Sequence, residues 1–376
     1  MATNFHYKWR RSSRREKFLT GVSLHGHTWH SKENLGFLPD FAEKVSPFAR
    51  LLARAEASHE KKWGEGIDYR YAYWTSPISP EDAYLLEAKQ VEKENLSPLV
   101  SLSDHDETAA NEELIDIHKK NVPISLEWSV PYKKFIFHVG VHNLPRAKSA
   151  SLLAEMRAFT AKPDGKVLAD ILARLHKIPE VLIVLNHPLT DQGRIGREIP
   201  VPVVDEFLAH YGKWMHALEV NALQSWETNR RVMVIAERIG LPLISGGDRH
   251  GLEPSGMINL TNARTFQEFV HEIRDEKKSD ILLMPQSRKS LFVRYAGQIS
   301  EIVDRYPALK GREFWHDRVF YTGKDGVTRS LTEMSAPDSP SLAAVNQYLK
   351  LLDLAMAGFV KPISPFLART KESDIS

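Results

Sequence analysis

The amino-acid sequence contains no cysteine among its 376 residues. This absence excludes disulfide bonds, and any bound metal ion must be held by nitrogen and oxygen ligands alone. No stretch of about 18 residues is free of charge, so we expect no transmembrane helix. The sequence also lacks a Gly-x-Ser-x-Gly elbow, a phosphate-cradling P-loop and a dinucleotide glycine fingerprint after a strand, so no nucleophilic-serine or nucleotide-cofactor arrangement competes with a metal site.

The overall composition is typical of a soluble globular protein, with 42% hydrophobic and 26% charged residues. We expect a cytoplasmic protein. The net charge of +2 gives no global basic field that would favour nucleic acid. The basic N-terminal segment lacks the apolar core and cleavage site of a signal peptide. We predict that residues 1–17 form a solvated arm, with contact to RNA or phosphate as the alternative.

Short apolar segments alternate with helix-length segments through the middle of the chain. Val181-Leu-Ile-Val-Leu185 is an unbroken apolar run typical of a parallel strand covered on both faces. Ser79-Pro80 sets a capping residue and a first-turn proline before a helix. The predicted strands cover residues 18–25, 99–103, 122–126, 135–140, 181–185, 217–220 and 241–244, and the predicted helices lie in 40–59, 79–95, 106–120, 147–177 and 226–239.

This alternation predicts an α/β fold built from βαβ units, and about seven such units favour a barrel over an open sheet. We predict the barrel over residues 18–285, with an insertion at about 28–78 that forms a lid or a substrate wall. Residues 286–376 are predicted to be a C-terminal extension packed on the barrel. It should contain a hairpin at Asp325-Gly326 and a helix over about 340–358.

Histidines and carboxylates stand at or just beyond the predicted strands. They are His25, His27, Asp104, His105, Glu127, His138, His187, Asp248 and His250. Delivering such residues at strand ends is how a barrel builds a multi-metal hydrolytic site. Imidazoles bind Zn²⁺, Mn²⁺ or Fe²⁺, and carboxylates neutralise and bridge the ions.

Six segments, in order along the chain, resemble the PHP family (polymerase and histidinol phosphatase). They are Leu24-His-Gly-His-Thr28, Leu102-Ser-Asp-His-Asp-Glu-Thr108, Ile124-Ser-Leu-Glu-Trp-Ser129, Phe137-His-Val-Gly140, Leu185-Asn-His-Pro188 and Ser245-Gly-Gly-Asp-Arg-His250. The resemblance implies a distorted (β/α)7 barrel, up to three metal ions at its C-terminal face, and phosphoester hydrolysis as the usual activity.

The resemblance also implies a ligand set of eight residues. One metal ion would take His25, His27, Glu127 and Asp248. Glu127 would bridge to a second ion, which it shares with His138 and His187, and a third ion would use His105 and His250. Glu127 is the bridging catalytic residue in this scheme, and His250 is a candidate proton donor to the leaving group.

The sequence departs from the family pattern after the first histidine pair. Where the family has an aspartate for the third metal ion, this chain has Lys32. A lysine there would repel a third cation, so we predict two ions, with Lys32 on the substrate phosphate. Alternatively, Glu33 or His30 restores the third ligand by a slip of one residue.

Several other residues near the motifs could have either a functional or a structural role. Arg194 and Arg197 follow His187 in a glycine-containing loop and are candidate phosphate ligands, although surface arginines are common. His138 is preferred over His142 as the ligand of its strand. We predict that Asp104 fixes the His105 ring or its loop and that Arg249 is a structural ion-pair partner. Glu219 and Asn221 are expected to border the site.

The insertion is rich in aromatic residues that either stack on a base or sugar or pack the insertion's own core. They are Trp63, Tyr69, Tyr71, Tyr73 and Trp74.

We therefore predict a phosphatase that hydrolyses a small phosphorylated metabolite or nucleotide by means of a metal-activated hydroxide, with two to three divalent ions (Zn, Mn or Fe). The sequence keeps three alternatives open. They are a nuclease-like phosphodiesterase on short oligonucleotides, hydrolysis of a C–N or C–O bond, and a catalytically silent binding barrel. Nucleic acid is not favoured as a partner, no membrane partner is expected, and the oligomeric state is not indicated.

Overall fold

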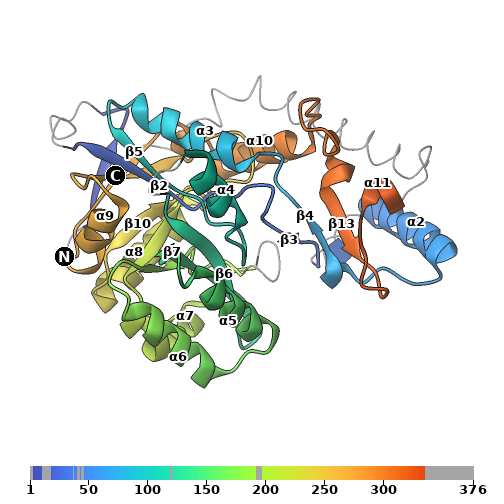
Figure 1. Ribbon diagram of the computed structural model, residues 1–376, viewed down its shortest axis with the longest axis horizontal. Coiled ribbons are helices and arrows are strands. Elements are labelled where there is room, and N and C mark those ends of the chain that lie inside the picture. Colours follow the sequence, from blue (N-terminus) through green and yellow to red (C-terminus); the bar gives the residue numbers. More distant parts are fainter. Residues whose placement is uncertain are drawn as a thin grey trace.

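The computed structural model describes residues 3–10, 18–36, 38–39, 43, 46–118, 122–191 and 197–334. Strands and helices alternate through it, which confirms the predicted α/β class. The described strands pair into three sheets, two of five strands and one of four. Figure 1 shows the two larger sheets together in one body and the small sheet beside it.

The first large sheet joins segments from both ends of the described chain. Its order is β1 (Thr3–Tyr7), β12 (Ser279–Leu283), β11 (Met257–Thr261), β2 (Thr20–Leu24) and β5 (Ser97–Ser101). β1 pairs in parallel with β12, with Thr3 opposite Ser279. The predicted solvated arm is therefore wrong for its first residues, because the backbone of Thr3–Tyr7 completes an edge of this sheet.

The second large sheet carries most of the predicted strands. Its order is β10 (Leu243–Gly246), β9 (Ala217–Asn221), β8 (Leu182–Asn186), β7 (Phe135–Leu144) and β6 (Ile124–Tyr132). β8, β9 and β10 are parallel, whereas β7 is antiparallel to both of its neighbours. The turn between β6 and β7 has two residues, Lys133 and Lys134, which is too short for the crossover that parallel strands need.

The two large sheets are joined by single bridges, Gly26 to Arg249 and His105 to Glu127. Within the described residues no sheet closes on itself, so a (β/α)7 barrel is not confirmed. The backbone gives a physical reason. His25, Asp106 and Asp248 have φ angles of 62°, 50° and 49°, which end the extended conformation beside each bridge.

Helices cover both large sheets, and the largest apolar core lies between the second sheet and the helices that pack on it. The predicted start of the helix after Ser79 is confirmed, because its hydroxyl accepts a hydrogen bond from the N–H of Asp82. No described helix is long and apolar enough to cross a membrane. The helices are α3 (Pro80–Glu92), α4 (Ala109–His118), α5 (Ser149–Ala161), α6 (Gly165–His176), α7 (Val201–Tyr211), α8 (Trp226–Ile239), α9 (Phe266–Arg274) and α10 (Leu291–Val303).

The small sheet unites the insertion with the C-terminal extension. Its order is β14 (Thr328–Ser330), β13 (Val319–Thr322), β4 (Ala72–Trp74) and β3 (Glu33–Asn34), and α2 (Ser46–Trp63) and α11 (Leu331–Met334) lie beside it. The predicted hairpin at Asp325-Gly326 is confirmed by the pairing of β13 with β14. Two parts of the predicted extension differ in their contacts: Arg294 of α10 donates to the carbonyl of Gln224, whereas β13 pairs with β4 of the insertion. The helix predicted over 340–358 lies outside the described residues.

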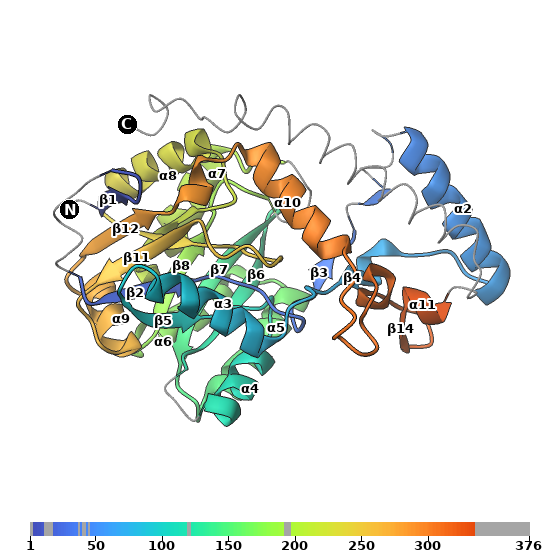
Figure 2. The same cartoon turned by 90° about the horizontal axis from the view of Figure 1, so that it is seen from above.

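The small sheet is attached to the rest of the molecule at several points. α10 runs along the core toward the small sheet (Figure 2). β3 begins six residues after His27, so the chain that leaves the first histidine pair leads directly into the small sheet. The fully buried Arg318, just before β13, donates to the carbonyl of Ile302 at 2.6 Å, near the end of α10. The small sheet is thus fixed against the C-terminal side of β2.

Candidate metal centre

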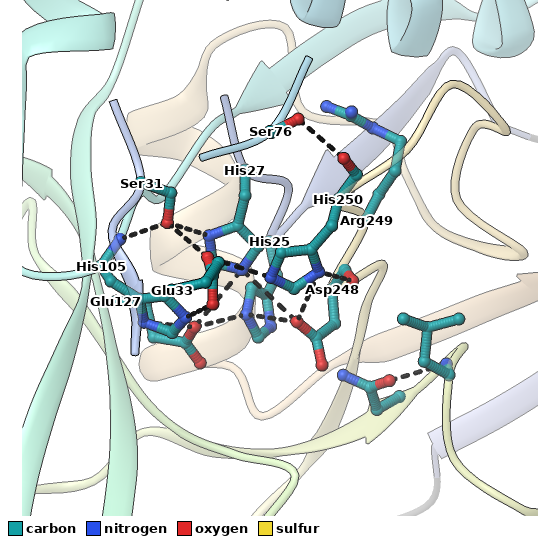
Figure 3. Close-up of polar contacts among 12 residues, drawn as sticks. His25, His27, Ser31, Glu33, Ser76, His105, Glu127, Asp248, Arg249 and His250 are labelled. Carbon is teal, nitrogen blue, oxygen red and sulfur yellow. Dashed lines mark hydrogen bonds and ion pairs between the residues drawn. The ribbon is translucent and has the colours of Figure 1, made fainter. Parts of the chain in front are cut away.

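Side chains delivered by β2, β3, β5, β6, β7, β8, β9 and β10, or by the loops after them, converge at the junction of the two large sheets. Figure 3 shows His25, His27, Glu33, His105, Glu127, Asp248 and His250 turned toward one another. Four overlapping groups of described residues have ligand atoms within 4.8 Å of one another. The groups are His25, His27, Glu127 and Asp248; His105, Glu127 and His138; His27, Glu33, His105 and His250; and His25, His187 and Glu219. All eight residues predicted as metal ligands belong to these groups, together with Glu33 and Glu219, which were outside that set.

Glu127 lies at the centre of the cluster. Its Oε2 is 3.0 Å from Nε2 of His25 and 3.3 Å from Nδ1 of His105. Its Oε1 is 3.0 Å from Nδ1 of His138 and 3.1 Å from Nε2 of His187. The two oxygens of one carboxylate therefore face two different sets of histidines, which is the arrangement that a bridging ligand requires.

Asp248 completes the first of these sets. Its Oδ1 lies 3.4 Å from Nε2 of His27 and 3.7 Å from Nε2 of His25. His27 Nε2 is in turn 3.4 Å from Oε2 of Glu127. Two imidazoles and two carboxylates thus surround one point, as the resemblance implied for the first metal ion.

Several of these ligand atoms are buried without a hydrogen-bond partner. They are Nε2 of His25, Nε2 of His27, Nδ1 of His105, Nδ1 of His138 and Oε2 of Glu127. Buried polar atoms are rarely left without a partner, and each such atom needs an explanation. These atoms are the nitrogen and oxygen ligands that suit borderline divalent cations, so the residues fit a metal centre.

The electrostatics of the cluster favour the ligand-competent protonation state for Glu127 and His27. Burial raises the pKa of the Glu127 carboxyl, but the neighbouring His138, His25 and His105 outweigh this and hold it well below its usual range. Burial, aided by His250, lowers the pKa of His27 to about 3. An ionised carboxylate and a neutral imidazole are the forms that bind a metal ion.

Glu33, rather than Lys32, lies beside the two histidines predicted for the third ion. The two oxygens of Glu33 lie 3.0 Å from Nε2 of His105 and 3.1 Å from Nε2 of His250. Lys32 is exposed, and its ammonium lies over the ring of Tyr73 at 5.2 Å. Neighbouring residues along an extended segment point to opposite sides, so Glu33 and not Lys32 faces His105 and His250, as in the one-residue slip that was the alternative. The number of bound ions, and a contact of Lys32 with a substrate phosphate, stay predictions.

Glu219 holds the ring of His25 from behind. Its Oε2 lies 2.7 Å from Nδ1 of His25, which leaves Nε2 of that ring turned toward Glu127 and Asp248. A carboxylate on the second nitrogen fixes the tautomer and orientation of a ligating histidine. Glu219 was predicted only to border the site. The feature that could have indicated this closer role was the position of Glu219 near the end of β9, beside β10.

The backbone is strained where it delivers the ligands. His25, His187 and Asp248 have positive φ angles of 62°, 24° and 49°. Residues other than glycine rarely adopt such values, and they persist when the surrounding structure imposes them. Strain at three residues of one cluster indicates that the cluster has a function beyond stability.

Three neighbouring residues have structural roles. Arg249 pairs with Glu87 at 2.9 Å, which confirms its prediction as an ion-pair partner. Asp104 accepts hydrogen bonds from the N–H and hydroxyl of Thr28, so it fixes the turn after His27 rather than the His105 ring. His142 faces Ser101 away from the cluster, whereas His138 contacts Glu127 as predicted.

The two arginines predicted to bind phosphate are not brought into the cluster. Arg197 forms an ion pair with Asp191, donates to the carbonyl of Lys134 at 2.7 Å and lies over the ring of Phe135. Arg194 lies outside the described residues. No described contact joins Arg197 to the ligand groups, so its role as a phosphate ligand stays a prediction.

No family model matches the sequence, and no curated protein is similar enough to count as a relative. Three solved structures are similar in part. A candidate metal-dependent phosphoesterase from Bifidobacterium adolescentis shares 17% identity with a TM-score of 0.34 over 53% of this chain and 91% of its own. An amidohydrolase from Chromobacterium violaceum shares 14% identity with a TM-score of 0.36 over 53% and 92%. PsfC from Pseudomonas syringae shares 15% identity with a TM-score of 0.38 over 73% and 95%. Similarity at this level assigns neither a family nor a function.

Proposed function

We propose that this protein is a metal-dependent phosphoesterase of the PHP type that acts as a phosphatase on a small phosphorylated metabolite or nucleotide. The observation that supports it best is the position of Glu127, whose two oxygens face separate sets of histidines. Divalent ions bound there would activate water and neutralise the charge of phosphoryl oxygens. This is the chemistry that phosphoester hydrolysis needs most.

The chain's own residues would bind the ions and fix their spacing. His25, His27, Glu127 and Asp248 would hold the first ion, and Glu127 would share the second with His138 and His187. Glu33, His105 and His250 would hold a third. These donors are all nitrogen and oxygen atoms, so Zn²⁺, Mn²⁺ and Fe²⁺ are the ions to test.

His250 was also a candidate proton donor to the leaving group. Its Nδ1 lies 2.9 Å from the backbone carbonyl of Asp248, so this nitrogen carries the proton and donates it. Its Nε2 then presents a lone pair toward the position beside Glu33, 3.1 Å away. We therefore propose that His250 serves as an ion ligand, and we do not assign it the proton transfer.

The direct test is release of inorganic phosphate from a panel of phosphomonoesters with added Mn²⁺, Zn²⁺ or Fe²⁺. We expect activity in the wild type and a loss of more than about a hundredfold in Glu127→Gln, because the amide cannot bridge two cations. Glu113→Gln is the matched control, since Glu113 is 39% exposed and contacts His30 outside the ligand groups. Activity that survives in Glu127→Gln, or cleavage confined to oligonucleotides, amides or lactones, would overturn the proposal.

A further inference from the structure

Four side chains of the ligand cluster reach solvent, and they mark its open side. The side chains of His25, His27 and Glu127 are 0% exposed. Those of Glu33, His105, Asp248 and His250 are 12 to 15% exposed. A substrate must therefore approach past these four residues, and whatever flanks them meets the part of the substrate that is not being hydrolysed.

Trp74 flanks this open side from the small sheet. It pairs with Glu33 in the register of β3 and β4, and its ring lies 5.7 Å from that of His250. The indole is partly buried and packs against the apolar core of the small sheet, formed by Leu35, Ala72, Tyr321 and Met334. Two residues further on, the hydroxyl of Ser76 donates to the carbonyl of His250 at 2.7 Å. Trp74 is thus a rigid aromatic surface beside a ligand residue.

The other aromatic residues predicted to stack on a ligand are engaged elsewhere. Tyr73 stacks on Phe320 at 5.2 Å, and Trp63 lies between the charged groups of Lys62 and Arg329. Tyr71 is 59% exposed and has no described ring contact. Of the five aromatic residues predicted to stack on a base or sugar, Trp74 is the one whose described ring contact reaches the ligand groups.

We propose that Trp74 forms a binding surface for a planar ring in the leaving group, so that the preferred substrates are aryl or nucleoside phosphates rather than aliphatic ones. This inference rests on the proposed phosphatase function. Stacking of a ring on an aromatic side chain is tolerant of ring identity, because every such ring has a π-face. The surface would therefore select planarity rather than a particular base.

The experiment compares kcat/KM for phenyl phosphate and adenosine monophosphate with that for glycerol phosphate in the metal-loaded protein. The wild type should prefer the two ring-bearing esters, and Trp74→Leu should reduce this preference about tenfold. Trp74→Phe should retain most of it, which guards against a folding defect as the cause. Tyr71→Leu is the matched control in the insertion, and it should leave the preference unchanged.

A second readout separates this inference from the proposed function. Adenosine carries the ring without the phosphate, so its titration by isothermal calorimetry reports ring binding independently of hydrolysis. Saturable binding that Trp74→Leu removes and that Trp74→Phe and Tyr71→Leu retain would support the surface even if no phosphate ester were hydrolysed. Phosphatase activity with no preference for ring-bearing esters, or a preference that Trp74→Leu leaves intact, would overturn the inference and leave the proposed function standing.

Discussion

Gly246 provides a test of how the His25 ring is held, through a change that touches no proposed metal ligand. A methyl group at Gly246 would collide with the carboxylate of Glu219, far inside van der Waals contact with its Oε2 and 2.9 Å from its Oε1. That carboxylate is buried and lies 2.7 Å from Nδ1 of His25. In Gly246→Ala the carboxylate must move by about 1 Å, and the hydrogen bond that orients His25 is lost.

The expected size of the effect follows from this geometry. Losing the carboxylate partner of a ligating histidine typically weakens metal binding by about 10- to 100-fold, which corresponds to about 1.4 to 2.7 kcal/mol. Overpacking adds a loss of about 1 to 3 kcal/mol in the free energy of unfolding of the metal-free protein. Glu219→Gln should weaken metal binding in the same direction without the collision, because the amide keeps the shape and loses the charge.

Isothermal titration with Mn²⁺ or Zn²⁺ measures the affinity, and thermal unfolding measures the stability of each variant. Gly212→Ala is the matched control, since its new methyl group would make ordinary contacts of 3.5 Å with Leu208. Combining Gly246→Ala with Glu219→Ala should cost little more than Glu219→Ala alone, because the collision partner is gone. A folded Gly246→Ala protein that binds metal with wild-type affinity would refute this reasoning.

Three further predictions concern the ligand cluster. Glu33→Gln should remove one bound divalent ion, counted by native mass spectrometry, whereas Lys32→Gln should leave the count unchanged. An ion gained in Lys32→Gln, with none lost in Glu33→Gln, would restore the lysine hypothesis. Burial lowers the pKa of His105, but Glu33 and Glu127 outweigh this and raise it to about 10, so the ion that binds His105 must displace a proton at neutral pH. The affinity of the protein for this ion should therefore rise with pH, and calorimetry in buffers of different ionisation heat should show proton release. An affinity that does not change with pH would contradict this prediction. Asn186→Ala removes a donor 2.9 Å from Oε1 of Glu127 and should weaken ion binding about tenfold by the same calorimetry; unchanged affinity would show that Glu127 needs no such support.

The sequence predicted the strands that carry the cluster because each is a local apolar run that ends on a histidine or carboxylate. The run at 181–185 corresponds to β8, and the segment at 217–220 corresponds to β9. β1, β11 and β12 were missed because their stability comes from distant pairing. Thr3 pairs with Ser279, which is far away in the sequence, and no local sequence pattern identifies such a partner.

Glu33 shows the same limit at the level of a single residue. Motif alignment put Lys32 at the third ligand position, and only the register of β3 against β4 decides that the neighbouring carboxylate faces His105. That register depends on β13, which lies about 245 positions later in the chain and pairs with β4. The insertion and the C-terminal extension had to be seen together before this ligand could be identified.

Anomalous scattering from crystals grown with Mn²⁺ tests the central claim most directly. The account predicts an ion bonded to each oxygen of Glu127, one of them also bonded to His25 and Asp248 and the other to His138. Crystals of protein saturated with Mn²⁺ in which no ion is bonded to Glu127 would contradict it.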